Sequence, residues 1–151
     1  MDEAEKIKST GNRLFKERKY ELAKAKYEKV LKDFNNVNPQ DDDEGKIFVQ
    51  TRSSLHLNMA ACYQKIGEYK RSLESCNKVL GENPRHSKAL YRRGIAYMSC
   101  GDLDEARKDF NMIIDVDKSL EPDVTTALAK LRRMAKGIVT ARQWMHDKFP
   151  I

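Results

Sequence analysis

The chain has 151 residues, 40% of them hydrophobic and 34% charged, with a formal net charge of +6. This length suits one domain with a sizeable core. The longest apolar run, residues 59–63, is far too short to cross a membrane, and the first residues lack the apolar core of a signal peptide. Residues 130–148 contain six Lys or Arg and one acid, so this segment carries +5 and the rest of the chain only +1. A positive charge confined to the C-terminal segment argues against a nucleic-acid surface on the domain.

The apolar spacing predicts helices along the whole chain. We expect them at residues 2–16, 20–34, 44–66, 69–80, 87–100, 103–116 and 122–148. Asp2 is a plausible N-cap for the first helix, and Pro122 suits the start of the last. The four acids of residues 41–44 are expected to cap the third helix. A metal or phosphate role for them is disfavoured, because no alternating ligand loop is present.

Residue types recur at fixed intervals. One set of six positions comprises Leu90, Gly94, Tyr97, Ala106, Phe110 and Ile113. Shifting it back by 34 residues gives His56, Ala60, Tyr63, Ser72, Cys76 and Val79. A third copy lies 49 residues further upstream, at Ile7, Gly11, Leu14, Ala23, Tyr27 and Val30. The extra 15 residues predict an insertion between the first two copies.

This pattern resembles the tetratricopeptide repeat, a hairpin of two helices. The resemblance implies an all-α fold, an α-solenoid of three hairpins with a C-terminal capping helix. We place the repeats at about residues 4–37, 53–86 and 87–118, within a domain of residues 1–118. The insertion falls at about residues 35–50, and the capping helix and tail occupy residues 119–151. The small residues should lie where the two helices of a hairpin meet, and the larger ones, including Tyr27 and Phe110, between hairpins. The alternative, an ordinary helical bundle, requires the spacing to be coincidental.

In this family the first helix of each hairpin lines the inner wall of the solenoid. Lys88 and Arg92 lie four residues apart in one such helix, so both project from one face. With side chains from the two earlier hairpins they predict a groove whose polar set is Lys8, Asn12, Asn58, Lys88 and Arg92, with apolar contacts from Phe15, Ala61 and Ile95. Amide donors and cations of this kind suit a chain end that carries two carboxylates.

The segments K-x-x-x-N, L-N-x-A-A and K-A-L-Y-R-R-G also match the carboxylate clamp of tetratricopeptide-repeat co-chaperones. Further stretches, such as G-N-x-L-F-K and A-L-Y-R-R-G-x-A-Y, resemble the repeat region of large FKBP-type immunophilins over residues 1–120. The resemblance implies binding of the acidic C-terminal tail of a cytosolic heat-shock chaperone, with the 90-kDa class favoured over the 70-kDa class. It also implies a cytoplasmic protein, with the nucleus as a second compartment. We expect neither isomerase activity nor a cofactor in this chain, because the isomerase domains of the family lie upstream of the repeats.

The C-terminal segment has a second interpretation. Its spaced apolar and basic residues, Leu131, Arg132, Arg133, Met134, Ile138 and Trp144, are typical of a helix that binds calmodulin. The competing interpretation is that Leu131, Met134, Ile138 and Met145 pack on the third repeat and cover its open end. We favour the covering role, and keep calmodulin as the alternative partner.

The remaining candidates for chemistry are weak. The histidines, His56, His86 and His146, stand apart from any cysteine or acid at metal-ligand spacing, which favours structural or surface roles. The three cysteines are an odd number at ordinary helical positions, and we expect reduced thiols. No nucleophile–histidine–acid set or glycine-rich phosphate loop is present, so the sequence favours a binding module.

Overall fold

The computed structural model describes residues 3–149, apart from the side chain of Val139, so the expected N-cap Asp2 lies outside the described residues. Within residues 3–149 the structure is helical and contains no strand, which confirms the all-α prediction. The helices are α1 (Glu3–Lys16), α2 (Tyr20–Asn35), α3 (Asp42–Lys65), α4 (Tyr69–Glu82), α5 (Ser87–Cys100), α6 (Leu103–Val116) and α7 (Glu121–Lys148), with a short 3-10 helix, η1 (Lys118–Leu120), before α7.

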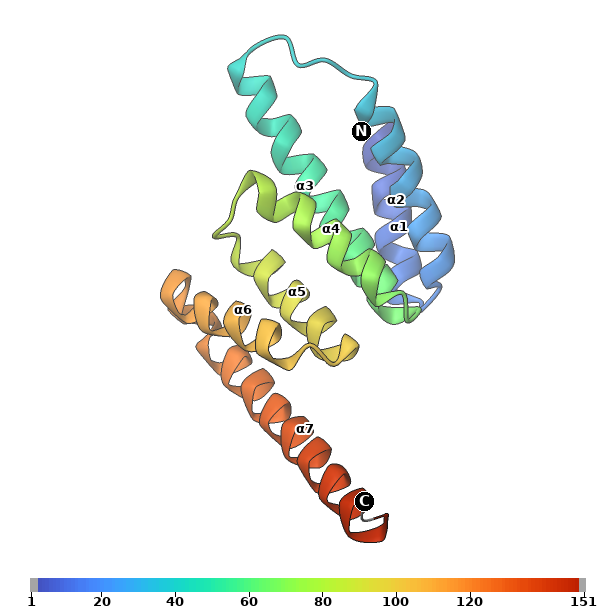
Figure 1. Cartoon of the computed structure of the whole chain (residues 1–151). Helices are drawn as coiled ribbons and strands as arrows, with labels where there is room; N and C mark the ends of the chain where they lie inside the picture. Colours follow the sequence, from blue (N-terminus) through green and yellow to red (C-terminus); the bar gives the residue numbers. More distant parts are fainter. Residues whose placement is uncertain (1–2, 150–151) are drawn as a thin grey trace.

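The first six helices form three stacked hairpins, as the repeat pattern predicts (Figure 1). α1 packs on α2, α3 on α4 and α5 on α6, while α2 contacts α3 and α4 contacts α5. The central helix α3 supplies both halves of the core, because Leu55 and Met59 pack with the first hairpin whereas Leu57 packs with α4 and α5. No single hairpin can bury its apolar side alone, which is why the three stack.

Two glycines let the helices of the outer hairpins approach closely. A Cβ atom on Gly94 would lie 2.6 Å from Cε1 of Phe110, and one on Gly11 would lie 2.8 Å from Cε1 of Tyr27. Tyr27 and Phe110 therefore pack against the first helix of their own hairpins. Each also belongs to a core cluster that includes residues of the neighbouring hairpin, Leu55 for Tyr27 and Leu57 for Phe110. In the middle hairpin Ala60 takes the glycine position, and the Ser72 hydroxyl donates a hydrogen bond to its carbonyl at 2.9 Å.

The repeat is also visible in the backbone of the turns. Gly67 and Gly101 have φ of +82° and +85° at equivalent positions of the second and third hairpins. Arg18 takes the same position in the first hairpin with φ of +64°. This left-handed conformation suits glycine and is less favourable for arginine, so the first hairpin keeps the shape of the turn without its preferred residue.

The insertion forms a short loop and an extension of α3. α3 has 24 residues where α1 and α5 have 14, and it begins at Asp42, slightly earlier than expected. The Asp41 carboxylate caps it by accepting a hydrogen bond from the Glu44 amide at 2.7 Å, and the Glu44 carboxylate accepts one from the Gln40 amide at 2.7 Å. These acids thus act as the predicted caps. α4 runs to Glu82, two residues beyond the expected end at residue 80, so Gly81 lies inside the helix.

The buried polar groups on α3 and α4 have structural roles. Cys62 and Cys76 are buried, which raises the pKa of their thiols to about 11 and about 12. Burial, helped by Lys78 and Arg52, lowers the pKa of His56 to about 4, so this side chain is neutral at physiological pH. All three cysteines are free thiols, and the described residues contain no group of three or more His, Cys, Asp and Glu that could hold a metal ion.

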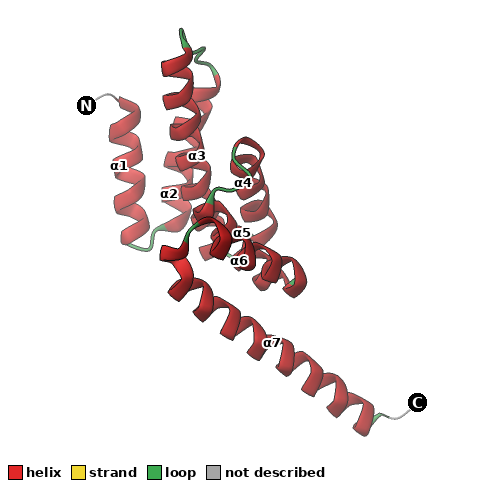
Figure 2. Cartoon of the chain, turned by 90° about the vertical axis from the view of Figure 1, so that its left-hand side faces the viewer, coloured by secondary structure: helices red, strands yellow, loops and turns green. Residues whose placement is uncertain are grey.

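α7 covers the third hairpin with its first half only. Leu131 is fully buried and Met134 packs against the same cluster, which confirms the covering role for these two residues. Ile138 and Met145 are 40% and 57% exposed, so the expectation that they pack on the repeat is wrong. The reason is length: α7 has 28 residues against the 14 of α6, and its second half projects away from the hairpins (Figure 2). None of the described helices has the length and apolar character needed to span a membrane.

We predict that Gly94→Ala destabilises the domain by about 1–3 kcal/mol, because the new methyl group would overlap the buried Phe110 ring. Urea unfolding, monitored by the circular dichroism signal of the helices, would measure the change in the free energy of unfolding. The matched control is Gly81→Ala, where nothing lies within 4 Å of the new Cβ and alanine's higher helix propensity should leave stability equal or raised by up to about 1 kcal/mol. Equal effects of the two substitutions would contradict the close-approach account.

Candidate functional site

One pocket is built by the first helices of all three hairpins. It has a volume of about 250 Å³ and opens to solvent. Its lining residues are Asn12, Phe15 and Lys16 of α1, Tyr27 of α2, Asn58 and Ala61 of α3, and Arg92 of α5. We call it the clamp pocket. Five of the eight residues predicted for the groove lie in it, drawn from positions as distant in the chain as Asn12 and Arg92.

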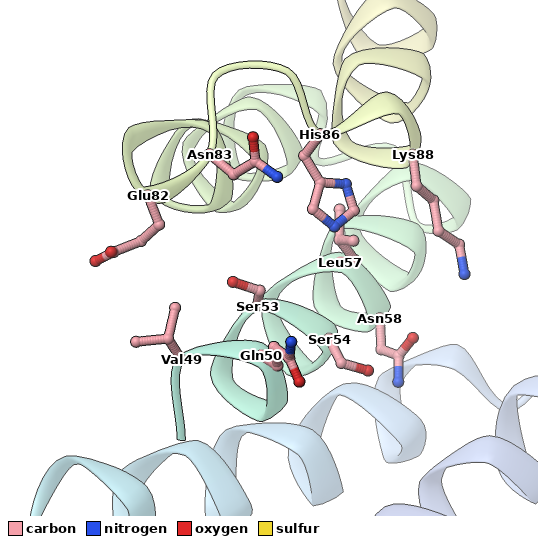
Figure 3. Close-up of a pocket in the computed structure, with 10 residues that line it drawn as sticks. All are labelled: Val49, Gln50, Ser53, Ser54, Leu57, Asn58, Glu82, Asn83, His86 and Lys88. Carbon is pink, nitrogen blue, oxygen red and sulfur yellow. The ribbon is translucent and has the colours of Figure 1, made fainter. Parts of the chain in front are cut away.

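A second pocket of about 400 Å³ adjoins the first, because Asn58 lines both. Its lining residues are Val49, Gln50, Ser53, Ser54, Leu57, Asn58, Glu82, Asn83, His86 and Lys88 (Figure 3). We call it the side pocket. The predicted Lys88 lies here, one helical turn before Arg92 on α5. The extension of α3 forms one wall of the side pocket, through Val49 and Gln50, so the insertion contributes directly to the site.

Two predicted residues line neither pocket. Lys8 is half-buried on α1, four residues before Asn12 and on the same helix face. Ile95 is half-buried on α5 and packs against the core cluster of the third hairpin. The structure therefore brings Asn12, Asn58 and Arg92 together and places Lys8 outside the two pockets.

Two further residues of the clamp pocket, Lys16 and Tyr27, are not among the site residues predicted from the sequence. The Lys16 spacing of four from Asn12 was visible in the sequence, whereas Tyr27 was interpreted as packing only. Its hydroxyl donates a hydrogen bond to Oδ1 of Asn12. Burial raises the pKa of Tyr27 to about 12, so the phenol keeps its proton at neutral pH. With its carbonyl oxygen occupied in this way, Asn12 has its NH₂ group left to donate to a ligand.

Neighbouring arginines on α5 have different surroundings. Arg93 makes a bidentate pair with the buried Asp109, at 2.9 and 2.7 Å, and also donates to Oδ1 of Asn77 at 3.0 Å, which ties α5 to α6 and α4. Arg92 turns about 100° away around the helix axis and lines the clamp pocket. Within residues 3–149 no ion pair joins Lys16, Lys88 or Arg92 to an acid. The two pockets thus combine cations that lack an acidic partner in this part of the chain with amide donors, which suits an anionic ligand.

The comparisons with known proteins agree with this geometry. The tetratricopeptide repeat family matches residues 53–86 and 87–120. Among curated relatives, the peptidyl-prolyl cis-trans isomerase PASTICCINO1 of Arabidopsis thaliana is 67% identical over 94% of this chain and 24% of its own length. The peptidyl-prolyl cis-trans isomerase FKBP4 of Homo sapiens is 28% identical over 88% of this chain and 30% of its own length.

Solved structures show the same fold. The C-terminal tetratricopeptide-repeat domain of a putative FK506-binding protein of Plasmodium falciparum has a TM-score of 0.71 at 28% identity, covering 91% of each chain. The first such domain of Spaghetti (RPAP3), bound to the HSP90 peptide SRMEEVD, has a TM-score of 0.66 at 25% identity, covering 90% of this chain and 93% of that one. The second such domain of human RPAP3, in complex with the HSP70 peptide SGPTIEEVD, has a TM-score of 0.65 at 28% identity, covering 83% of this chain and 92% of that one.

The chain belongs to the tetratricopeptide-repeat family and is a repeat domain of the kind found in FKBP-type immunophilins. It spans only 24% and 30% of the length of these two curated relatives. The repeat is a protein-interaction fold, and the isomerase activity in the relatives' names belongs to other domains of those proteins. This chain is therefore not the enzyme part of such a protein.

We predict that Tyr27→Phe lowers the free energy of unfolding by about 1 kcal/mol, because it removes the hydrogen bond to Asn12 without changing the packing on Gly11. Thermal and urea unfolding would measure it. The matched control is Tyr63→Phe, whose hydroxyl lies 3.5 Å from Glu28 and should matter less. A larger loss for Tyr63→Phe than for Tyr27→Phe would contradict this assignment.

Proposed function

We propose that the clamp pocket and the side pocket together bind the acidic C-terminal tail of a heat-shock chaperone. The observation that carries this proposal is the convergence of Asn12, Asn58 and Arg92, one from each hairpin, on a single pocket. The related domains support it, because two of them were solved with chaperone peptides that both end in Glu-Glu-Val-Asp. A terminal aspartate carries two carboxylates within a few ångströms, which matches a site built from several separate donors.

Each part of the site suits one part of such a peptide. The amides of Asn12 and Asn58 donate to carboxylate oxygens, and Arg92 and Lys88 add charge-assisted hydrogen bonds. Phe15 and Ala61 offer apolar surface to the side chain next to the terminal residue. Lys8 and Lys16 lie at the α1 edge, where their charges attract an acidic chain without full desolvation. Partial burial makes the bonds of Arg92 and Asn58 stronger than those at this edge.

We favour the 90-kDa class of chaperone over the 70-kDa class, as the immunophilin resemblance implies. The two solved peptides share their last four residues, so the pockets that hold the terminus recognise both classes, and residues further upstream discriminate between them. For the whole protein we propose a co-chaperone of the cytosol, present also in the nucleus, in which this domain docks isomerase-like domains onto the chaperone.

Calorimetry with a short acidic peptide ending in Glu-Glu-Val-Asp should give a roughly micromolar dissociation constant, about −8 kcal/mol. Arg92→Ala should weaken binding by about 2–5 kcal/mol, because it removes a half-buried partner of a carboxylate. Amidation of the peptide's C-terminus should cost a similar amount. Lys29→Ala, which removes one exposed positive charge from α2 outside both pockets, should leave affinity within about twofold. Unchanged affinity in Arg92→Ala and with the amidated peptide would reject the proposal.

A second candidate function rests on the exposed end of α7. Ile138, Trp144 and Met145 remain exposed beyond the point where the helix leaves the third hairpin, and basic residues accompany them. Leu131 and Met134 are occupied by the core, so a calmodulin site would have to begin near Ile138 and would exclude part of the segment predicted from the sequence.

For this second candidate we predict a calcium-dependent change in Trp144 fluorescence when calmodulin is added, because burial of an exposed indole shifts its emission to shorter wavelength. Trp144→Phe removes the signal and serves as the control. Emission that stays constant with excess calcium-loaded calmodulin would eliminate the candidate and leave α7 as a cover for the third hairpin only.

A further inference from the structure

We propose that His86 is a further ligand-contacting residue: its Nε2–H group, in the side pocket, donates a hydrogen bond to the side-chain carboxylate of the ligand's last residue. His86 would then select for an acidic residue at that position. This inference rests on the proposed function and adds to it a residue that decides which terminal side chain is accepted.

The His86 imidazole carries its proton on Nε2. His86 is the N-cap of α5, and its Nδ1 accepts a hydrogen bond from the Ala89 amide at 3.2 Å. A ring nitrogen that accepts a hydrogen bond carries no proton, so the proton of the neutral imidazole lies on Nε2. The helix cap therefore fixes both the orientation of the ring and the tautomer, and leaves Nε2–H available as a donor.

His86 lines the side pocket together with Lys88, Asn58 and Ser54. Figure 3 shows the imidazole reaching from the start of α5 towards Leu57, with the Lys88 and Asn58 side chains on the neighbouring part of the wall. A cation, an amide, a hydroxyl and an imidazole N–H thus line one cavity, a set that suits a carboxylate better than an apolar or cationic group.

The last residue of the ligand can reach both pockets, because the two pockets adjoin. Asn58 lines the clamp pocket as well as the side pocket. The α-carboxylate and the side-chain carboxylate of a terminal aspartate are separated by only a few ångströms. One carboxylate can therefore contact Asn12 and Arg92 while the other contacts Lys88 and His86, with Asn58 between them.

One acid also lines the side pocket and requires explanation. Glu82 is paired with Arg52, whose Nη2 lies 3.2 Å from Oε1 of Glu82. In Figure 3 its carboxylate lies on the opposite side of the pocket from Lys88 and points away from His86. Its charge is balanced there by Arg52, so it does not oppose an anion held beside His86 and Lys88.

The test measures His86→Asn against two peptides that differ only in their last residue, one ending in Glu-Glu-Val-Asp and the other in Glu-Glu-Val-Ala, both with a free terminal carboxylate. Asparagine is itself a good N-cap but places no donor at the Nε2 position. We expect the substitution to weaken binding of the Asp-ended peptide about 3- to 10-fold. Binding of the Ala-ended peptide should be unchanged, because its methyl side chain accepts no hydrogen bond. Fluorescence anisotropy titration would measure both affinities.

Two further variants complete the test. His146→Asn makes the same replacement at an exposed position of α7 outside both pockets and should change neither affinity. His86→Ala removes both the cap and the donor, so it should lower the melting temperature while shifting the ratio of the two affinities as His86→Asn does. Because the ratio is taken within one variant, it does not depend on the fraction of protein that is folded.

The outcomes separate the two proposals. If wild-type protein binds the Asp-ended peptide and His86→Asn leaves the ratio of the two affinities unchanged, the role of His86 is wrong and the clamp stands. If wild-type protein binds neither peptide, the proposed function fails, and the role of His86 fails with it.

Discussion

The close approach of two helices within each hairpin is the constraint on which the site depends. Gly11 allows the Tyr27 ring to lie directly on α1, and Gly94 does the same for Phe110 on α5. This contact sets how far apart the helices of a hairpin lie, and stacking then brings α1, α3 and α5 to one wall. Tyr27 links packing to recognition, because the ring that fills the hairpin also carries the hydroxyl that orients Asn12.

The second organising feature is the separation of structural charges from available ones. Asp109 is buried and requires a partner, and Arg93 satisfies it with two hydrogen bonds. The cations that line the two pockets have no such acid within the part of the chain that the structure describes. Arg92 is half-buried whereas Lys16 and Lys88 are exposed, and an anion held in the two pockets is attracted by all three charges. The site therefore gains from a doubly charged chain end in a way that scattered surface lysines do not.

Much of the fold and of the clamp pocket was predictable from the sequence, because the repeat pattern constrains where each helix lies. The recurring small residues identified the hairpins, and Asn12, Asn58 and Arg92 followed from their positions on the first helices. The sequence did not show that Tyr27 packs within its hairpin, because spacing alone cannot say to which side of a helix pair a ring turns. Nor did it show the side pocket, whose wall depends on the direction in which the inserted residues extend α3.

The residues at the ends of the stack were the least predictable. Lys8 matches the expected pattern but lines neither pocket, because its position relative to α5 depends on how the stacked hairpins curve. On α7 the apolar spacing continues past Met134, although the third hairpin beneath the helix has ended. The spacing therefore predicted a longer packed segment of α7 than the structure has. His86 was assigned a structural role, and it does cap α5. That role is also what aims its free N–H group into the side pocket.

The central claim is that one chain end contacts all three hairpins at once. The most direct measurement is a nuclear magnetic resonance titration with an acidic Glu-Glu-Val-Asp peptide that follows the side-chain amides of Asn12 and Asn58 and the guanidinium of Arg92. The account predicts that all three signals shift together with one dissociation constant, while the indole of Trp144 does not move. Shifts confined to α7, or amide signals of Asn12 and Asn58 that stay fixed while the peptide binds, would contradict it.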